Sequence, residues 1–229
     1  MMSAHTQDEI FSAEGDQWFE RNKTFLVPKE GRSDVTTTFL RGASFRPKAI
    51  LDIGCANGYF LDHVVSLFPG AEGYGIEPSA RAVEDGQTHF PRLHLSRGAS
   101  HELGAYRDGQ FDCIILQFVL HWVDRRHLLK TIAEVDRVLA DGGHVLIADF
   151  FPAEPCKTRY HHLPNEEVYT YKQPYWELFT ATKCYSLLDL REFTHDGSAD
   201  KNPMNRCALA VLEKRTLEAY PLADIGGTH

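Results

Sequence analysis

Basic residues are scarce in this 229-residue sequence. Lysine and arginine together number 24 against 32 aspartate and glutamate residues, which gives a net charge of -8 at pH 7. Proteins that bind nucleic acid without sequence preference neutralise its phosphates with clustered cations. The sequence has no basic stripe of that kind, so we expect no nucleic-acid partner. Long apolar runs are also missing: none approaches the roughly 20 residues that a membrane-spanning helix needs, and no membrane association is expected.

Cysteine is rare as well, and its spacing argues against structural uses. The five cysteines are an odd number, spread along the chain with no C-x-x-C pair. This pattern favours reduced thiols and is a poor match to the spacing of zinc ligands. The first residues, Met1-Met2-Ser3-Ala4-His5-Thr6, lack the charged and then apolar pattern of a secretion signal. We therefore expect a cytoplasmic protein without a metal site.

The most informative segment is an apolar strand followed by a glycine turn. Residues Ala49–Ile53 are typical of a buried strand, and Gly54 and Gly58 follow them before a helical pattern begins. Such a turn brings bare backbone and a helix N-terminus up to a ligand. Glu77 ends the next apolar run, nineteen positions after Gly58. An acidic side chain at this spacing can accept hydrogen bonds from both hydroxyls of an adenosine ribose, so the pair predicts a nucleoside cofactor.

The glycine pattern distinguishes between nucleoside cofactors. A dinucleotide fingerprint requires G-x-G-x-x-G, but Ala56 stands at the second glycine position and Tyr59 at the third. An NAD(P)-dependent oxidoreductase is therefore disfavoured. The pattern Asp52-x-Gly54-x-Ala56-x-Gly58 instead resembles motif I of the class I S-adenosylmethionine (SAM) methyltransferases. In that family the turn meets the methionine part of SAM.

The resemblance extends in order and spacing over residues 49–150. Gly98-Ala99-Ser100 stands where the family carries a segment that contacts adenine. Residues 109–116 resemble the family's fourth strand, and residues 141–149 its glycine turn and fifth strand. The resemblance implies SAM as cofactor and S-adenosylhomocysteine (SAH) as its product. The cofactor-binding residues that it implies are Asp52, Gly54, Ala56, Gly58, Glu77, Ala99, Ser100 and Gln117.

Strand and helix patterns alternate from residue 49 to residue 149, which predicts an α/β sheet covered by helices on both faces. Together with the resemblance, this indicates a doubly wound, seven-stranded sheet of the class I methyltransferase type, with the last strand antiparallel. Helical patterns cover about 58–68 and 124–139, with Gly142-Gly143 ending the second, and Ser79 is the expected N-cap of a helix between them. The chain is expected to form one domain, divided into an N-terminal helical lid (1–48), the SAM-binding core (49–150), a substrate-side insertion (151–184) and closing strands (185–214).

Methyl transfer needs an acceptor aligned with the methyl group, and an acceptor hydroxyl must also lose its proton. His121 follows the fourth expected strand, at the edge where parallel sheets bind ligands, and it is the first candidate for the catalytic base. A histidine that only packs against the strand is the alternative.

A second candidate region is the segment 156–164. It holds four potentially cationic side chains, Lys157, Arg159, His161 and His162, which could hold a carboxylate or phosphate of the acceptor. We expect Arg159 to bind substrate, and His161 and His162 to be further candidates for the base. A solvated loop, balanced by nearby glutamates, is the alternative.

Aromatic and cationic side chains elsewhere complete the expected substrate site. Tyr160, Tyr171 and Lys172 lie in the same poorly periodic region, and their rings could stack on a sugar or a planar acceptor. Near the N-terminus, Trp18 and Arg21 could reach the site from a lid. A helix packed on the edge of the sheet is the alternative for this segment.

Three further motifs bear on the acceptor. Trp-Phe-x-Arg-Asn near the start, Asp-Phe-Phe-Pro after the fifth strand and Tyr-x-Tyr-Lys-Gln beyond it resemble a bacterial methyltransferase subgroup associated with sugar and surface-polysaccharide modification. This resemblance implies a small-molecule acceptor, with a hydroxyl of a sugar or nucleotide-sugar as the leading candidate. A non-catalytic subunit that keeps the fold and SAM is the rival hypothesis, and the sequence gives no oligomeric state.

Overall fold

The computed structural model of the protein describes residues 7–26, 34–195, 197 and 202–223. Residues 1–6, in which no secretion signal is expected, lie outside these residues. Among the described helices, none has both the length and the apolar character needed to cross a bilayer.

A seven-stranded sheet forms the centre of the molecule, in the order β3-β2-β1-β4-β5-β9-β8. The neighbouring strands from β3 to β5 are parallel, whereas β9 lies antiparallel between β5 and β8. The expected fold class, with the last strand antiparallel, is confirmed. The strands are β1 (Ala49–Ile53), β2 (Glu72–Glu77), β3 (His94–Arg97), β4 (Phe111–Gln117), β5 (Leu139–Phe150), β8 (Tyr185–Thr194) and β9 (Arg206–Lys214).

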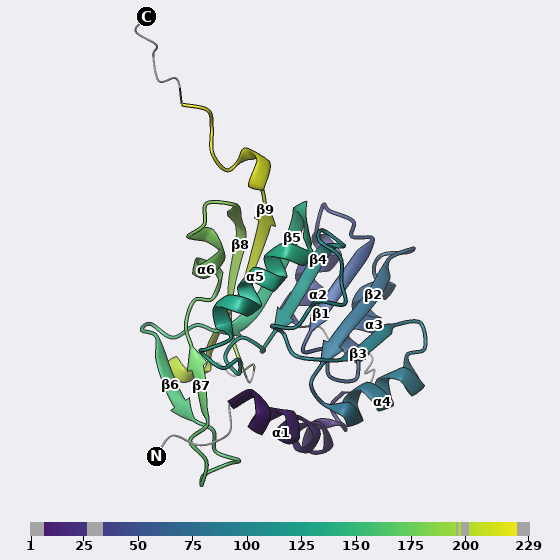
Figure 1. Ribbon diagram of the computed structural model, residues 1–229, viewed down its shortest axis with the longest axis vertical. Helices are drawn as coiled ribbons and strands as arrows, with labels where there is room; N and C mark the ends of the chain where they lie inside the picture. Colours follow the sequence, from purple (N-terminus) through teal and green to yellow (C-terminus); the bar gives the residue numbers. More distant parts are fainter. Residues whose placement is uncertain (1–6, 27–33, 196, 198–201, 224–229) are drawn as a thin grey trace, which may run out of the picture.

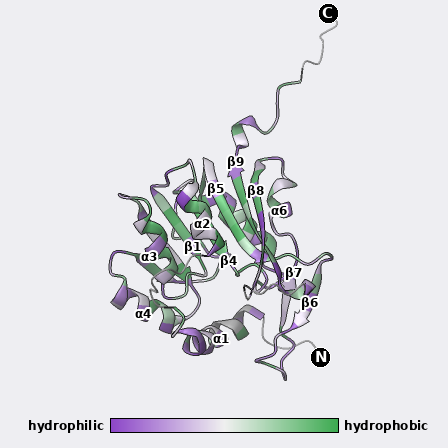
Figure 2. Ribbon diagram, turned by 180° about the vertical axis from the view of Figure 1, so that it is seen from behind, coloured by the Kyte–Doolittle hydropathy of each residue, from purple (hydrophilic) through white to green (hydrophobic). Residues whose placement is uncertain are grey.

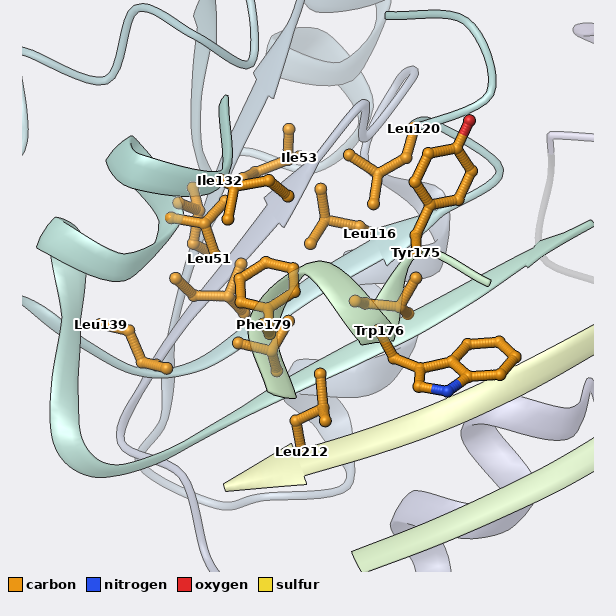
Figure 3. Packing of buried hydrophobic residues seen from close by; sticks show 14 of the residues in the cluster. Leu51, Ile53, Leu116, Leu120, Ile132, Leu139, Tyr175, Trp176, Phe179 and Leu212 are labelled. Carbon is orange, nitrogen blue, oxygen red and sulfur yellow. The ribbon is translucent and has the colours of Figure 1, made fainter. Parts of the chain in front are cut away.

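Helices cover both faces of this sheet (Figure 1; Figure 2 shows the other side). One apolar core joins the sheet to α5 and α6, where Ile132, Trp176 and Phe179 pack against strand residues such as Leu212 (Figure 3). A second core, on the other face, joins the sheet to α2 and α3. The helices are α1 (Gln7–Asn22), α2 (Val35–Gly42), α3 (Tyr59–Ser66), α4 (Ala80–His89), α5 (Leu128–Val138) and α6 (Trp176–Thr180), with single 3-10 turns η1 (Pro203–Asn205) and η2 (Thr216–Glu218).

The expected helix over 124–139 is shorter in the structure. It begins at Leu128 because residues 124–127 form a turn, in which the Asp124 carboxylate accepts the backbone N–H of Arg126 at 2.9 Å. The prediction that Gly142-Gly143 end this helix is wrong, because the chain passes into β5 at Leu139 and both glycines lie within that strand. The expected N-cap of α4 is confirmed: Ser79 Oγ accepts from the N–H of Ala82 at 3.1 Å.

Between β5 and β8 the chain forms a separate hairpin, β6 (Cys156–Arg159) and β7 (Tyr169–Lys172). Helix α1 lies across the carboxyl ends of the parallel strands (Figure 1). At its start, Gln7 Nε2 donates to the carbonyls of Trp122 and Tyr169, at 2.9 Å each. At its middle, Asp16 Oδ1 accepts from Ser79 Oγ at 2.6 Å. Helix α1 therefore bridges the loop after β4, the hairpin and the N-terminus of α4.

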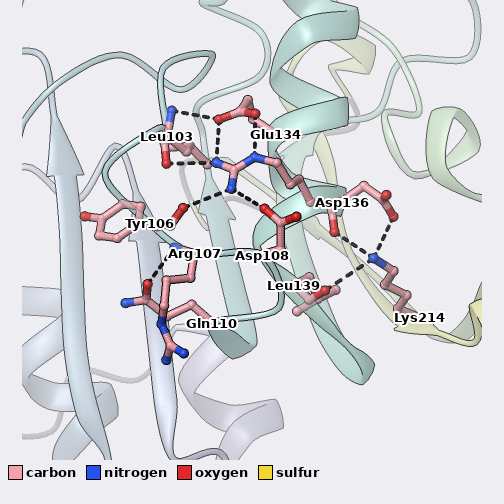
Figure 4. Close-up of polar contacts among 10 residues, drawn as sticks. Leu103, Tyr106, Arg107, Asp108, Gln110, Glu134, Asp136, Leu139 and Lys214 are labelled. Atoms are coloured by element: carbon pink, nitrogen blue, oxygen red, sulfur yellow. Dashed lines mark hydrogen bonds and ion pairs between the residues drawn. The ribbon is translucent and has the colours of Figure 1, made fainter.

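The loop between β3 and β4 is held against α5. Arg137 donates from its guanidinium to the carbonyls of Leu103 and Tyr106, both at 2.9 Å, and to the Glu134 carboxylate. Glu134 Oε2 in turn accepts the N–H of Leu103 at 3.1 Å (Figure 4). A charge-assisted network of this kind fixes the loop that follows the expected adenine segment.

Candidate active site

The turn after β1 adopts a backbone that favours glycine. Gly54, Ala56 and Gly58 all have positive φ angles, of 75°, 49° and 79°. A Cβ on Gly54 would lie 2.5 Å from a methyl carbon of Val119, so a larger residue does not fit there. Ala56 is strained because left-handed conformations are costly for residues with a Cβ. The expected glycine turn is thus present, with Ala56 in a conformation better suited to glycine.

Glu77, at the end of β2, is bound to this turn. Its Oε2 accepts the backbone N–H of Ala56 and its Oε1 that of Ser79, both at 3.0 Å. Burial raises the pKa of Glu77 to about 7, against the effect of these two hydrogen bonds. Nearby in β1, Asp52 is buried, and its pKa is raised by burial and by the charge of Glu77. A carboxylate has about four acceptor positions, so Glu77 keeps capacity for two ribose hydroxyls.

The remaining expected cofactor residues lie along the same edge of the sheet. Ala99 and Ser100 are half-buried in the loop after β3, where Ser100 Oγ lies 3.0 Å from Thr131 Oγ1 of α5. Gln117 ends β4, and its Oε1 accepts from the Thr36 hydroxyl of α2 at 2.9 Å. The side chains of Ser100 and Gln117 therefore both have protein partners. Strand β4 lies directly beside β1, whereas β3 is separated from β1 by β2.

His121 lies just past the end of β4, beside a buried carboxylate. Its Nδ1 is 2.8 Å from Oδ1 of Asp149, an ion-pair distance without the alignment of a hydrogen bond. Asp149 also accepts the backbone N–H groups of His121, at 3.2 Å, and Phe150, at 2.7 Å. The His121 carbonyl accepts the N–H of Tyr171 from the hairpin at 2.9 Å. With Nδ1 directed at Asp149, Nε2 is the ring atom that can exchange a proton with a ligand.

Aromatic rings gather beside His121. Phe118 has a φ of 57°, an outlier for a bulky residue, and backbone strain of this kind collects at functional sites. Its ring centroid lies 5.6 Å from that of Phe150 and 4.9 Å from that of the exposed His195. The carboxyl ends of β4 and β5 are thus lined by aromatic side chains.

The hairpin places its expected substrate residues on two faces. On one face, the cations of Lys157 and Arg159 lie 4.2 and 5.7 Å from the ring centroid of Tyr169, with Tyr171 next to it along β7. Lys172 is on the opposite face, where its Nζ lies 3.8 Å from the Phe150 centroid and donates to the Met204 carbonyl at 3.1 Å. Burial lowers the pKa of Lys172.

Arg21 and Tyr160 are brought together, and Glu14 joins them. Glu14 is buried and accepts hydrogen bonds from the Arg21 guanidinium and, at 2.7 Å, from the Tyr160 hydroxyl. Arg21 also donates to Tyr160 Oη at 3.0 Å. These three side chains fasten α1 to the end of β6, and Trp18 lies half-buried in the same helix.

His161 and His162 are exposed, in the loop after β6. Their ring centroids lie 4.0 Å apart and within 5.6 Å of Tyr160. Tyr160 also packs edge-on against Trp122 at 4.6 Å, and Trp122 packs beside His121. These rings connect the two candidate regions for a base. In the part of the chain that the structure describes, no group of three or more potential ligands is arranged to hold a metal ion.

Two residues that the sequence reasoning missed are central to this geometry, namely Asp149 and Glu14. Asp149 and His121 are 28 positions apart, but Asp149 lies near the carboxyl end of β5 and His121 lies just past the carboxyl end of the neighbouring parallel strand β4. This shared position at the edge of the sheet could have identified Asp149 as a neighbour of His121 from the sequence. Glu14 gives no such signal, because its role depends on how α1 lies across the hairpin.

Comparison with known proteins finds similarity between the core of this chain and methyltransferases. Residues 51–145 match a family model described as a methyltransferase domain. The chain is 26% identical over 117 residues to a malonyl-[acyl-carrier protein] O-methyltransferase of Halalkalibacterium halodurans, covering 49% of this chain and 42% of that protein. The matched residues contain both the glycine turn and Glu77, and over them the chain is similar to a methyltransferase domain.

Other methyltransferases are similar to the chain over comparable lengths. The norajmaline N-methyltransferase of Rauvolfia serpentina is 31% identical over 113 residues, which is 47% of this chain and 37% of that protein. The chain thus spans less than half the length of these curated methyltransferases. A 1,6-didemethyltoxoflavin-N1-methyltransferase of Burkholderia thailandensis, solved with that compound and SAH, shares the fold with a TM-score of 0.69 at 13% identity, over 91% of this chain and 88% of that one.

The residues of the candidate site fit SAM as cofactor. Glu77 has free acceptor capacity at the ribose position, and the left-handed turn at Gly54 and Gly58 allows close approach of a ligand to the backbone. His121 lies just past the carboxyl end of β4, at the edge where parallel sheets bind ligands.

Proposed function

We propose that this protein transfers the methyl group of SAM to a hydroxyl of a small-molecule acceptor. The observation that carries the proposal is the contact between Glu77 and the Ala56 N–H, which fixes an acidic side chain beside the glycine turn. When bound, SAM supplies a methyl group on a sulfonium, already activated for displacement. The protein's own contribution is then alignment and proton removal.

Each group in the site has a distinct task under this proposal. The turn at 54–58 and Glu77 hold the cofactor, and Asp149 orients His121. The Nε2 atom of His121 accepts the proton of the acceptor hydroxyl as it attacks the methyl carbon. Burial of His121 (4% exposed) and Asp149 (3% exposed) keeps bulk water away from this step. Exposed His161 and His162 are the alternative bases, and the two arrangements can be separated by mutation.

A sugar or nucleotide-sugar hydroxyl is the acceptor that we propose to test first. Tyr169 and Tyr171 offer faces on which a planar or sugar ring can stack. Lys157 and Arg159 beside them supply two cations for a phosphate or carboxylate. The acceptors in the relatives' names differ widely, from malonyl-[acyl-carrier protein] to norajmaline. The acceptor of this chain therefore needs its own measurement.

The experiment is methyl transfer from radiolabelled SAM to a panel of acceptors, with nucleotide-sugars and free sugars first, then carboxylic acids and amines. Labelled product with the wild type but not with His121→Ala supports the proposal. A His161→Ala/His162→Ala protein serves as the matched comparison and is expected to retain turnover. Full activity in His121→Ala would remove His121 from the chemistry. SAH binding without turnover of any acceptor would favour a non-catalytic subunit instead.

A further inference from the structure

Strand β8 carries an exposed apolar surface at the end of the sheet. It is the last strand in the sheet order, so its outer edge is paired with no strand in the described part of the chain. Three of its leucines are exposed: Leu187 by 41%, Leu188 by 49% and Leu190 by 38%. We call these three residues and the intervening Asp189, together with Arg191, the β8 edge. An edge strand presents backbone N–H and C=O groups on its open side, and residues 187–191 of β8 are therefore a ready template for another strand.

The residues next to the β8 edge extend this surface. Helix α6 has only five residues and contacts β8 near its start, where Phe179 packs against Tyr185. Beyond β9, Leu217 and Tyr220 are also exposed, and Tyr220 bonds to the Thr182 carbonyl just before β8 begins. This segment leads away from the sheet (Figure 1). Exposed leucines gathered on one rim are typical of an interaction surface rather than of single surface residues.

The charges of the β8 edge indicate what covers it. Asp189 and Arg191 flank Leu190, and they form an ion pair at 2.8 Å within the strand. If two copies of β8 lie antiparallel about a two-fold axis at Leu190, Asp189 of each copy stands opposite Arg191 of the other. The same axis places Leu190 against its own copy. An isologous interface requires such self-complementarity.

We propose that the β8 edge pairs with the β8 edge of a second copy of this chain, joining the two sheets into one. The backbone groups of both edges then gain hydrogen bonds, and the exposed leucines lose contact with water. Two reciprocal pairs between Asp189 and Arg191 fix the register. The register shift between Leu187 and Asp189, where β8 bulges against β9, recurs on both sides of the axis and leaves residues 189–191 as the regular pairing at the centre. This inference does not depend on the proposed activity.

Sedimentation velocity of the full chain over a range of micromolar concentrations tests the proposal. The wild type is expected to sediment with twice the mass of one chain. Leu190→Lys places two like charges on the axis and is expected to give a monomer. Leu129→Lys is the matched control, because Leu129 is 72% exposed on α5, outside the β8 edge, and it is expected to leave the dimer intact.

A charge exchange tests the register itself. Arg191→Asp puts two carboxylates opposite each other and is expected to weaken association at least tenfold. Adding Asp189→Arg restores complementary pairs, so the double variant is expected to recover the dimer. Thermal unfolding midpoints of all variants show whether the monomer is folded. A wild type that stays monomeric, a Leu190→Lys protein that still dimerises, or an exchange variant that fails to recover while folded would each overturn the proposal.

Discussion

The Glu77 carboxylate and the Ala56 amide, 21 positions apart in the sequence, are joined by a hydrogen bond of 3.0 Å. It links the end of β2 to the turn after β1, the two features from which the sequence predicted a nucleoside cofactor. The bond holds the carboxylate in place before a ligand arrives. A preorganised acceptor of this kind lowers the ordering cost of binding.

Glu77 should make stability depend on pH. Burial raises its pKa from an ordinary 4.5 to about 7, so between these values the folded protein keeps a proton that the unfolded chain has lost. The free energy of unfolding therefore falls as pH rises through this window and is level above it. Relative to Glu77→Gln, which does not titrate, wild type should lose on the order of 2 kcal/mol from pH 4.5 to pH 7. Urea unfolding of both proteins across that range measures the difference, and parallel pH profiles would contradict it.

Replacing Ala56 with glycine should stabilise the protein. Its left-handed backbone costs an L-residue about 1–2 kcal/mol, which exceeds the entropy lost by introducing glycine. We expect Ala56→Gly to raise the free energy of unfolding by about 0.5–1 kcal/mol, as measured by urea unfolding. Ala13→Gly in α1, at an exposed helical position, is the matched control and should lower stability by a similar amount. A destabilised Ala56→Gly protein would show that the turn does not strain Ala56.

Asp149 should act through His121. Replacing it with Asn keeps the shape but removes the charge that holds His121 Nδ1. We expect kcat for a responsive acceptor to fall by roughly 100-fold or more, the range associated with general-base catalysis. SAH affinity, measured in parallel, should stay within a factor of two or three of the wild type. Equal losses in SAH affinity and kcat would instead assign Asp149 a structural role.

The hairpin cations should affect acceptor binding alone. The side-chain cations of Lys157 and Arg159 both lie near the ring of Tyr169. Among the ion pairs of the described residues, none joins an acidic side chain to either cation. With an anionic acceptor, Lys157→Ala/Arg159→Ala should raise KM about tenfold and change kcat little, since the binding is lost equally in ground and transition states. Lys130→Ala on α5 is the control for loss of surface charge. An unchanged KM would show that this face of the hairpin does not meet the acceptor.

The buried strands could be read from the sequence with little error. The predicted bounds of β1 are those of the structure, because this strand is an apolar run ended by a glycine turn. Helix α5 was placed less well, since its apolar face continues to Leu139 although the backbone has already become a strand there. The spacing of apolar residues shows which side chains are buried. It does not show where a helix ends when a strand follows directly, as at Leu139.

The candidate site was less predictable than the sheet. Glu77 and the turn are local features. They lie within one βαβ unit, in which the distance along the chain from the turn to the acidic residue is characteristic. The pairing of His121 with Asp149 depends instead on the register between β4 and β5, and the hairpin has no clear period in its sequence. Lys172 and Tyr171 are adjacent in the chain, but the alternation of a strand sends them to opposite faces. The sequence alone therefore did not show that these two side chains lie on different faces of the hairpin.

Calorimetric titration with SAH, with NAD in parallel, tests the central claim that this turn and Glu77 hold the nucleoside of SAM. We expect one SAH to bind per chain with micromolar affinity, at least tenfold weaker binding by a folded Glu77→Gln protein, and no heat from NAD. Binding of NAD, or SAH affinity unchanged by Glu77→Gln, would contradict the account.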